Sequence, residues 1–201
     1  AQFVPVRRDD ENSKQGMEWE IRRRAFEEGW PQVGIFPEGT CGNGTALLGF
    51  RLGAFSPALP VQPVVIRYDF DRHLGVDPSW AGFEIGLPRI ALRLMAQPWN
   101  SMHVTVLDVA VPTLEEKVKP ALFAKRVRKA MADALHVPRT PHNVDDVLVQ
   151  MEALRLKLKP SDVMVGMTDV RSRFNFTVDD VKRSLVQFQA MDVNQDGSLS
   201  Y

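Results

Sequence analysis

Residues 33–45 carry the strongest signal in this chain: Val33-Gly34-Ile35-Phe36-Pro37-Glu38-Gly39-Thr40-Cys41-Gly42-Asn43-Gly44-Thr45. The first four residues form an apolar run, typical of a buried strand, and the run stops at Pro37. Glycines, two threonines and the carboxylate of Glu38 follow. Glycine lets backbone amides approach an anion closely, and hydroxyl groups add donors. The pattern therefore predicts either a phosphate-binding loop after a strand or an ordinary glycine-rich turn.

The order of residues within this stretch resembles a motif of a known family. Phe36-Pro37-Glu38-Gly39-Thr40 is similar to the third motif of the glycerophospholipid acyltransferases, which transfer acyl chains from acyl-CoA to lysophospholipids. Most members of that family continue with Arg-Ser after Glu-Gly-Thr. Here Cys41-Gly42-Asn43 follows, which resembles the lysophosphatidylcholine acyltransferase subgroup.

Two flanking segments extend the resemblance. Phe3 and Val4, with Arg7, Arg8 and Asp10, resemble the second motif of the family. Residues 53–64, which contain Gly53-Ala54-Phe55 and Leu59-Pro60-Val61-Gln62-Pro63-Val64, resemble the fourth. The resemblance covers roughly residues 1–137. It implies a glycerophosphate-acyltransferase-like α/β domain that uses acyl-CoA as co-substrate, and the subgroup carries EF-hands after this domain.

The resemblance also implies a lysophospholipid site, formed by Arg7, Arg8, Glu38, Gly39, Thr40, Cys41 and Asn43. Arginine suits a phosphate because its planar guanidinium presents paired donors, although Arg7 and Arg8 are alternatively exposed surface residues. Glu38 either fixes the loop by accepting backbone hydrogen bonds or contacts the glycerol hydroxyl. Cys41 stands where most of the family has a phosphate-binding arginine, which fits the choline-type subgroup. As the single cysteine, it excludes an internal disulfide.

The catalytic base is expected outside the chain. Acyl transfer to a hydroxyl needs a base, usually a histidine oriented by a carboxylate. The resemblance places this His-x4-Asp motif before the second motif, hence upstream of Ala1, so we expect residues 1–201 alone to be inactive. His103 and Asp108 have the same spacing, but they lie in an alternating, strand-like segment. A separation of five on a strand puts the side chains on opposite faces, roughly 16 Å apart, so we predict that His103 is not the base.

The last ten residues form a second motif. Asp192-Val193-Asn194-Gln195-Asp196-Gly197-Ser198-Leu199-Ser200-Tyr201 matches the start of an EF-hand calcium loop. The predicted ligands are Asp192, Asn194, Asp196, Ser198 and Ser200, and Gly197 makes the sharp turn. The bidentate glutamate of position 12 falls two residues past Tyr201. The sequence therefore predicts a calcium site that residues 1–201 contain only in part.

Periodicity and turn residues predict an α/β domain over residues 1–137 followed by an all-α EF-hand region over residues 143–201. Predicted strands are 3–6, 33–36, 61–68 and 103–111, and their alternation with helices indicates a sheet with substantial parallel pairing. Predicted helices are 13–28, 87–99, 114–135, 144–158, 161–170 and 178–191, with a short helix or compact loop at 45–55. Pro138 and Pro141 form a stiff connector near residue 140.

Composition restricts the partners. The formal net charge is zero, which gives no support to nucleic-acid binding. No run of 18 apolar residues occurs. Basic residues cluster at 22–24 and within 117–129, where they bind anionic lipid or CoA phosphates or simply form a solvated helix face. Residues 87–99 either rest on a membrane surface or form a core helix.

The sequence favours a membrane-associated lysophospholipid acyltransferase with a calcium-binding EF-hand. Its expected localisation is the endoplasmic reticulum, with the Golgi or lipid droplets as alternatives. The competing interpretation is a non-enzymatic calcium sensor whose α/β domain binds lipid or a protein partner.

Overall fold

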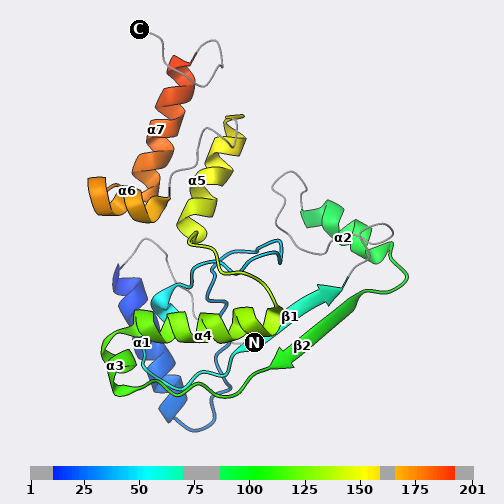
Figure 1. Cartoon of the computed structure of the whole chain (residues 1–201), viewed down its shortest axis with the longest axis vertical. Helices are drawn as coiled ribbons and strands as arrows, with labels where there is room; N and C mark the ends of the chain where they lie inside the picture. Colours follow the sequence, from blue (N-terminus) through cyan, green and yellow to red (C-terminus); the bar gives the residue numbers. More distant parts are fainter. Residues whose placement is uncertain (1–10, 70–86, 159–165, 193–201) are drawn as a thin grey trace. The chain divides into compact units, whose positions relative to one another are not determined.

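The computed structural model describes residues 11–69, 87–158 and 166–192 (Figure 1). The chain divides into two compact units, residues 1–139 and 140–201. The first contains α1 (Glu11–Phe26), the 3-10 helix η1 (Leu52–Ala54), β1 (Val64–Asp69), α2 (Leu87–Met95), β2 (Ser101–Val106), α3 (Leu114–Val118) and α4 (Pro120–Leu135). The second contains α5 (Val144–Arg155), α6 (Met167–Phe174) and α7 (Val178–Met191). The described part is thus mainly helical, with one small sheet.

The sheet consists of β1 and β2, which pair antiparallel as a two-stranded ribbon (Figure 1). Its register places Val64 opposite Val106 and Tyr68 opposite Met102. The prediction of substantial parallel pairing is wrong for the described residues, where a single isolated bridge between Leu47 and Arg139 is parallel. A helix between two strands suggested a crossover, but β2 follows α2 closely. A parallel pair needs a connection that recrosses the sheet, whereas an antiparallel pair does not.

Burial within residues 64–68 of β1 is confined to Val65. This residue is 4% exposed, whereas Val64, Ile66 and Tyr68 are between 41% and 47% exposed and Arg67 is exposed as well. Helix α4 packs on β1.

The predicted strand at residues 33–36 does not form. These residues belong to no helix or strand, and the Phe36 side chain is 83% exposed. An apolar run becomes a strand only if a neighbouring strand pairs with it, and that depends on distant residues. The predicted strand at residues 3–6 lies outside the described residues.

The core of the first unit joins η1 to α4. Phe55, Phe123, Ala124 and Val127 form its buried cluster. The Phe55 ring stands edge-on to Phe123, with the centroids 5.4 Å apart, and stacks on Phe50 at 6.0 Å. Aromatic pairs favour these geometries, and Phe123 is fully buried. The segment that follows the glycine-rich loop is therefore held against α4.

The predicted helix over 114–135 is two helices, with a break at Lys119. Pro120 disfavours helical backbone at the residue before it and is itself well suited to the first turn of α4. A capping box starts α3: Glu116 N donates to the Thr113 hydroxyl, and Thr113 N donates to the Glu116 carboxylate. The carboxylate also accepts two hydrogen bonds from Arg126, at 2.6 and 2.8 Å, which ties α3 to α4.

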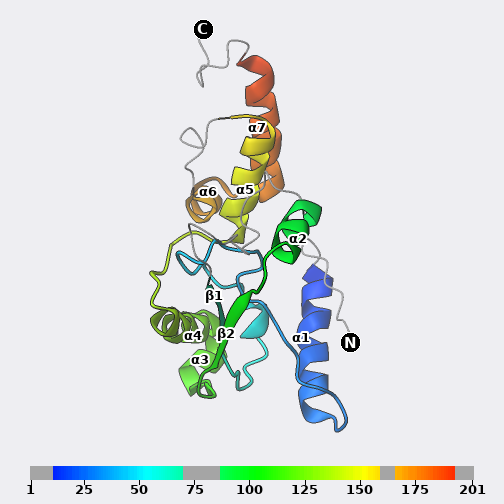
Figure 2. The ribbon, with the colours of Figure 1, turned by 90° about the vertical axis from the view of Figure 1, so that its right-hand side faces the viewer.

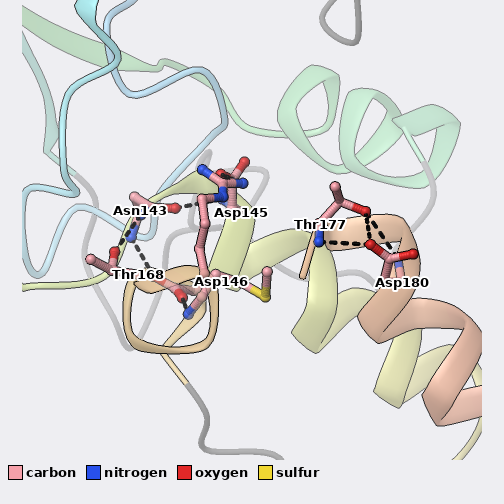
Figure 3. Close-up of polar contacts among 8 residues, drawn as sticks. Asn143, Asp145, Asp146, Thr168, Thr177 and Asp180 are labelled. Atoms are coloured by element: carbon pink, nitrogen blue, oxygen red, sulfur yellow. Dashed lines mark hydrogen bonds and ion pairs between the residues drawn. The ribbon is translucent and has the colours of Figure 1, made fainter. Parts of the chain in front are cut away.

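In the second unit, α5 and α7 lie side by side (Figures 1 and 2). Helix α7 covers the predicted residues, and Thr177 caps it through a capping box with Asp180 (Figure 3). Asp146 joins two other helix starts: it accepts from Asn143 N at the start of α5 and from Met167 N at the start of α6 (Figure 3). The predicted helix 161–170 is displaced, because α6 spans Met167–Phe174 and residues 161–165 lie outside the described ranges.

Candidate functional site

The glycine-rich segment forms a loop closed at its base by backbone hydrogen bonds. Arg51 N donates to the Pro37 carbonyl at 2.8 Å, which brings the two ends of the loop together. At the entrance, Gly39 N donates to the Phe36 carbonyl in a tight turn, with Pro37 second in the turn. Gly39 has φ of +70°, a conformation that favours glycine. Backbone hydrogen bonds therefore fix both the base of the loop and its first turn.

A second turn forms at the tip. The Asn43 side-chain oxygen accepts from Thr45 N at 3.1 Å and from the Thr45 hydroxyl at 2.7 Å. Gly44, between them, has φ of +72°. Asparagine commonly stabilises such turns by bonding to its own backbone two residues on. The Asn43 amide oxygen therefore holds Thr45 at the exposed tip of the loop.

Glu38 spans the loop. One of its carboxylate oxygens accepts a hydrogen bond from Leu48 N at 2.9 Å. Burial raises the pKa of Glu38, while the Leu48 hydrogen bond and the nearby Arg128 act in the opposite direction. The observed contact is of the loop-fixing kind, one of the two roles that the sequence left open for this carboxylate.

Arg128 also contacts the loop, from α4. Its guanidinium donates to the Leu47 carbonyl at 2.5 Å. Sequence reasoning did not select this residue for the site, because it lies within a run of basic residues. The helical spacing could have identified it, because Arg128 falls one turn after the buried Ala124 and one turn before the buried Ala132. An arginine on the apolar stripe of a helix needs a specific partner.

The remaining predicted site residues have simpler surroundings. Thr40 is half-buried, and the Cys41 thiol is exposed at the loop surface. Arg7 and Arg8 lie outside the described residues. The structure thus brings Glu38, Gly39 and Asn43 into one braced loop, and it adds Arg128 to them.

The basic clusters are largely occupied by ion pairs. In α1, Glu20 accepts from Arg23 and Arg24, and the Arg23 and Arg24 hydrogen bonds lower the pKa of this carboxyl to about 2. In the second cluster, Arg126 pairs with Glu116, and Lys129 pairs with Asp133. These pairs favour the solvated-face interpretation over a lipid or CoA phosphate site.

The structure describes only the first residue of the predicted calcium loop. Asp192 ends α7, is 5% exposed, and donates its N–H to the Phe188 carbonyl. The other predicted ligands, Asn194, Asp196, Ser198 and Ser200, fall outside the described ranges. Within residues 11–69, 87–158 and 166–192, no cluster of His, Cys, Asp and Glu is arranged to hold a metal. The EF-hand therefore stays a prediction.

Comparison with known proteins places the loop in its family context. The family model described as "Acyltransferase" matches residues 1–67, which include the whole glycine-rich loop. The chain is 36% identical to mouse lysophosphatidylcholine acyltransferase 2B over 98% of its own length and 38% of that relative. The chain is thus similar to acyltransferases. Other relatives are rat lysophosphatidylcholine acyltransferase 1 (41% identity; 79% of the chain, 29% of the relative) and Arabidopsis thaliana lysophospholipid acyltransferase LPEAT2 (35%; 98% and 36%).

These relatives confirm the resemblance to the lysophosphatidylcholine acyltransferase subgroup. The chain spans less than two fifths of the length of each of these relatives. A search of solved structures gave no significant match. None of the described helices is both long and apolar enough to cross a membrane.

Proposed function

We propose that the protein is an acyl-CoA-dependent lysophospholipid acyltransferase with lysophosphatidylcholine as its acceptor. The observation that carries the proposal is the braced loop of residues 37–51, which lies wholly within the family match and is held by Glu38, Asn43 and Arg128. The names of the relatives support the same reaction and acceptor.

In this proposal the chain binds and orients the lysophospholipid. The acceptor hydroxyl attacks the thioester carbonyl, its proton passes to the histidine expected upstream, and the CoA thiolate leaves and takes up a proton. Backbone N–H groups of the glycine-rich loop hold the phosphate, which fixes the hydroxyl relative to the thioester. The exposed Cys41 lacks the positive charge of an arginine and so suits a head group that carries its own cation.

The test is acyl transfer by the full-length protein from radiolabelled acyl-CoA to lysophosphatidylcholine. Glu38→Ala removes the Leu48 contact and is expected to lower the rate at least tenfold, because hydrogen bonds to charged groups contribute about 1.5–3 kcal/mol. Glu115→Ala, a change at an exposed glutamate on α3, serves as the control. Absence of transfer in the wild type, or a folded Glu38→Ala protein with normal activity, would contradict the proposal. Acyl transfer by the wild-type protein would also exclude the competing interpretation, a non-enzymatic calcium sensor.

We also propose that α2 rests on the membrane that holds the substrate, with the endoplasmic reticulum as the expected site. The side chains of Leu92, Met95 and Trp99 are 71%, 85% and 78% exposed, and Arg89 and Arg93 flank them. Exposed apolar groups beside arginines suit the boundary of a bilayer with anionic lipid. The opposite side of α2 carries Ile90, which is 7% exposed.

The calcium site is proposed from the motif together with its entering helix. Helix α7 leads directly into Asp192, the first predicted ligand. Asn194, Asp196, Ser198 and Ser200 supply the further oxygens that calcium prefers.

A further inference from the structure

The peptide unit that joins Leu47 to Leu48 is held from both sides. Its carbonyl oxygen accepts from the Arg128 guanidinium at 2.5 Å, and its N–H donates to the Glu38 carboxylate at 2.9 Å. In a planar trans peptide the C=O and the N–H point in opposite directions. Arg128 and Glu38 therefore lie at opposite edges of one peptide unit, and each carries the charge that complements the group it meets.

The N–H group and the side chain of Leu47 are held in place as well. Leu47 N donates to the Pro138 carbonyl at 2.9 Å, and the Leu47 side chain is 6% exposed. The backbone of Leu47 is thus tied to the segment that follows α4. With the position of Leu47 set, the remaining freedom is rotation of the peptide plane that follows it, and the two charged side chains restrict that rotation.

The charge of Arg128 needs compensation in this place. Burial lowers the pKa of Arg128, and the neighbouring Arg139 acts in the same direction, whereas Glu38 raises it. Guanidinium groups remain protonated in proteins, so Arg128 is a half-buried cation. Such a cation is tolerated when opposite charge and a carbonyl acceptor face it, and Glu38 and Leu47 provide both.

We propose that Arg128 is a positioning residue for the lysophospholipid loop. It fixes the plane of the Leu47–Leu48 peptide so that Leu48 N–H meets Glu38, and Glu38 then keeps the loop in its phosphate-binding shape. The inference rests on the proposed function, because it assigns Arg128 to the loop that binds the acceptor. It follows that loss of Arg128 weakens acceptor binding without touching the acyl-CoA site.

Kinetics of the full-length protein test this role. Arg128→Gln is expected to raise KM for lysophosphatidylcholine at least fivefold and to leave KM for acyl-CoA within twofold. Lys125→Gln, an exposed charge removed from the same helix, should leave both constants within twofold. Arg128→Lys retains a charged donor and should restore much of the lost affinity.

A double-mutant cycle tests whether the two side chains act on one peptide unit. Glu38→Ala and Arg128→Gln should not multiply in effect, because either change already releases the plane. Fully multiplicative effects would overturn the inference. An effect of Glu38→Ala with wild-type kinetics in Arg128→Gln would also overturn it while leaving the proposed function intact. If neither variant had an effect, the proposed function would fail as well.

Hydrogen exchange supplies a readout that does not depend on activity. Mass spectrometry of the peptide that contains Leu48 should show exchange at least tenfold faster in Arg128→Gln than in Lys125→Gln. If Arg128→Gln does not fold, Arg128→Lys provides the same comparison with a smaller expected increase. Unchanged exchange at Leu48 in a folded Arg128 variant would show that the peptide is fixed without this arginine.

Discussion

Removal of the Glu116 charge should destabilise the first unit in a pH-dependent way. The Glu116 carboxylate accepts from Thr113 N at 2.9 Å and from two nitrogens of Arg126. Arg126 in turn donates to the Val111 carbonyl at 2.8 Å. One nearly buried carboxylate therefore caps α3, binds Arg126 in the middle of α4 and, through Arg126, fixes the segment that follows β2. Glu116→Gln keeps the shape of the side chain and removes its charge.

The expected loss of unfolding free energy follows from the lowered pKa of Glu116. The Arg126 hydrogen bonds, together with the Thr113 N–H, lower the pKa of Glu116 from 4.5 to about 2 against the effect of burial. A fall of this size corresponds to about 3 kcal/mol of folding free energy. The Glu116 side chain is 9% exposed, but that of Arg126 is 46% exposed, so solvent screens the pair. We expect roughly half of the full value, about 1.5 kcal/mol, at neutral pH.

The sign of the pH dependence is fixed by the direction of the pKa change. Because the pKa is lower in the folded chain, the stabilisation is complete above about pH 4.5 and is lost as the pH falls towards 2. The difference in unfolding free energy between wild type and Glu116→Gln should therefore fall to less than half of its neutral value by about pH 3.

Thermal unfolding followed by tryptophan fluorescence is the assay, because all four tryptophans lie in the first unit. At pH 7, Glu116→Gln should lower Tm by roughly 4 °C. Glu115→Gln, at the exposed neighbouring residue, should change Tm by less than 1 °C, on the order expected for a surface ion pair. The reasoning would be refuted if Glu116→Gln and Glu115→Gln had equal Tm values. It would also be refuted if the difference in unfolding free energy between wild type and Glu116→Gln stayed constant from pH 7 to pH 3.

Three further outcomes are expected. His103→Ala should leave acyl transfer by the full-length protein within threefold of wild type, and a loss of several orders of magnitude in a folded variant would identify His103 as the base. Calorimetry should show that Asp196→Ala weakens calcium binding at least tenfold, whereas unchanged affinity would place the site elsewhere. Sedimentation with vesicles of phosphatidylcholine and phosphatidylserine should show weaker binding for Leu92→Gln/Met95→Gln than for the exposed control Leu114→Gln; equal binding would exclude α2 as the contact.

Local sequence signals predicted α7 of the second unit well, whereas α6 was predicted too early in the chain. The Thr177 cap and the apolar spacing after it predicted α7 over Val178–Met191, as observed. These signals act within one or two turns, so one sequence contains all that they need. The break between α3 and α4 was equally local, since Pro120 marks it, but the longer periodic pattern outweighed this proline in the prediction.

Local sequence signals could not predict which segments pair as strands or which distant residues contact the loop. The run at residues 33–36 has the composition of a strand, yet strand formation requires a neighbour that composition does not reveal. The loop residues Gly39 and Asn43 were identified through the resemblance to a family motif, which is a continuous stretch of sequence. Arg128 lies 81 positions from Leu47, and their contact depends on the packing of α4 against the rest of the unit.

Helix α4 explains how stability and substrate positioning are separated in the first unit. Arg126 and Arg128 are two positions apart, so their side chains project about 200° apart around the helix, one to Glu116 and the other to Leu47. The rotation of α4 about its axis is set independently by the burial of Val127 beside Phe55 and Phe123. Loss of the Glu116 contact should therefore reduce the unfolding free energy without turning Arg128 away from the loop. The KM for lysophosphatidylcholine should accordingly respond to Arg128→Gln and not to Glu116→Gln, whereas a common loss in both variants would mean that the end of α4, rather than a single peptide plane, sets the loop.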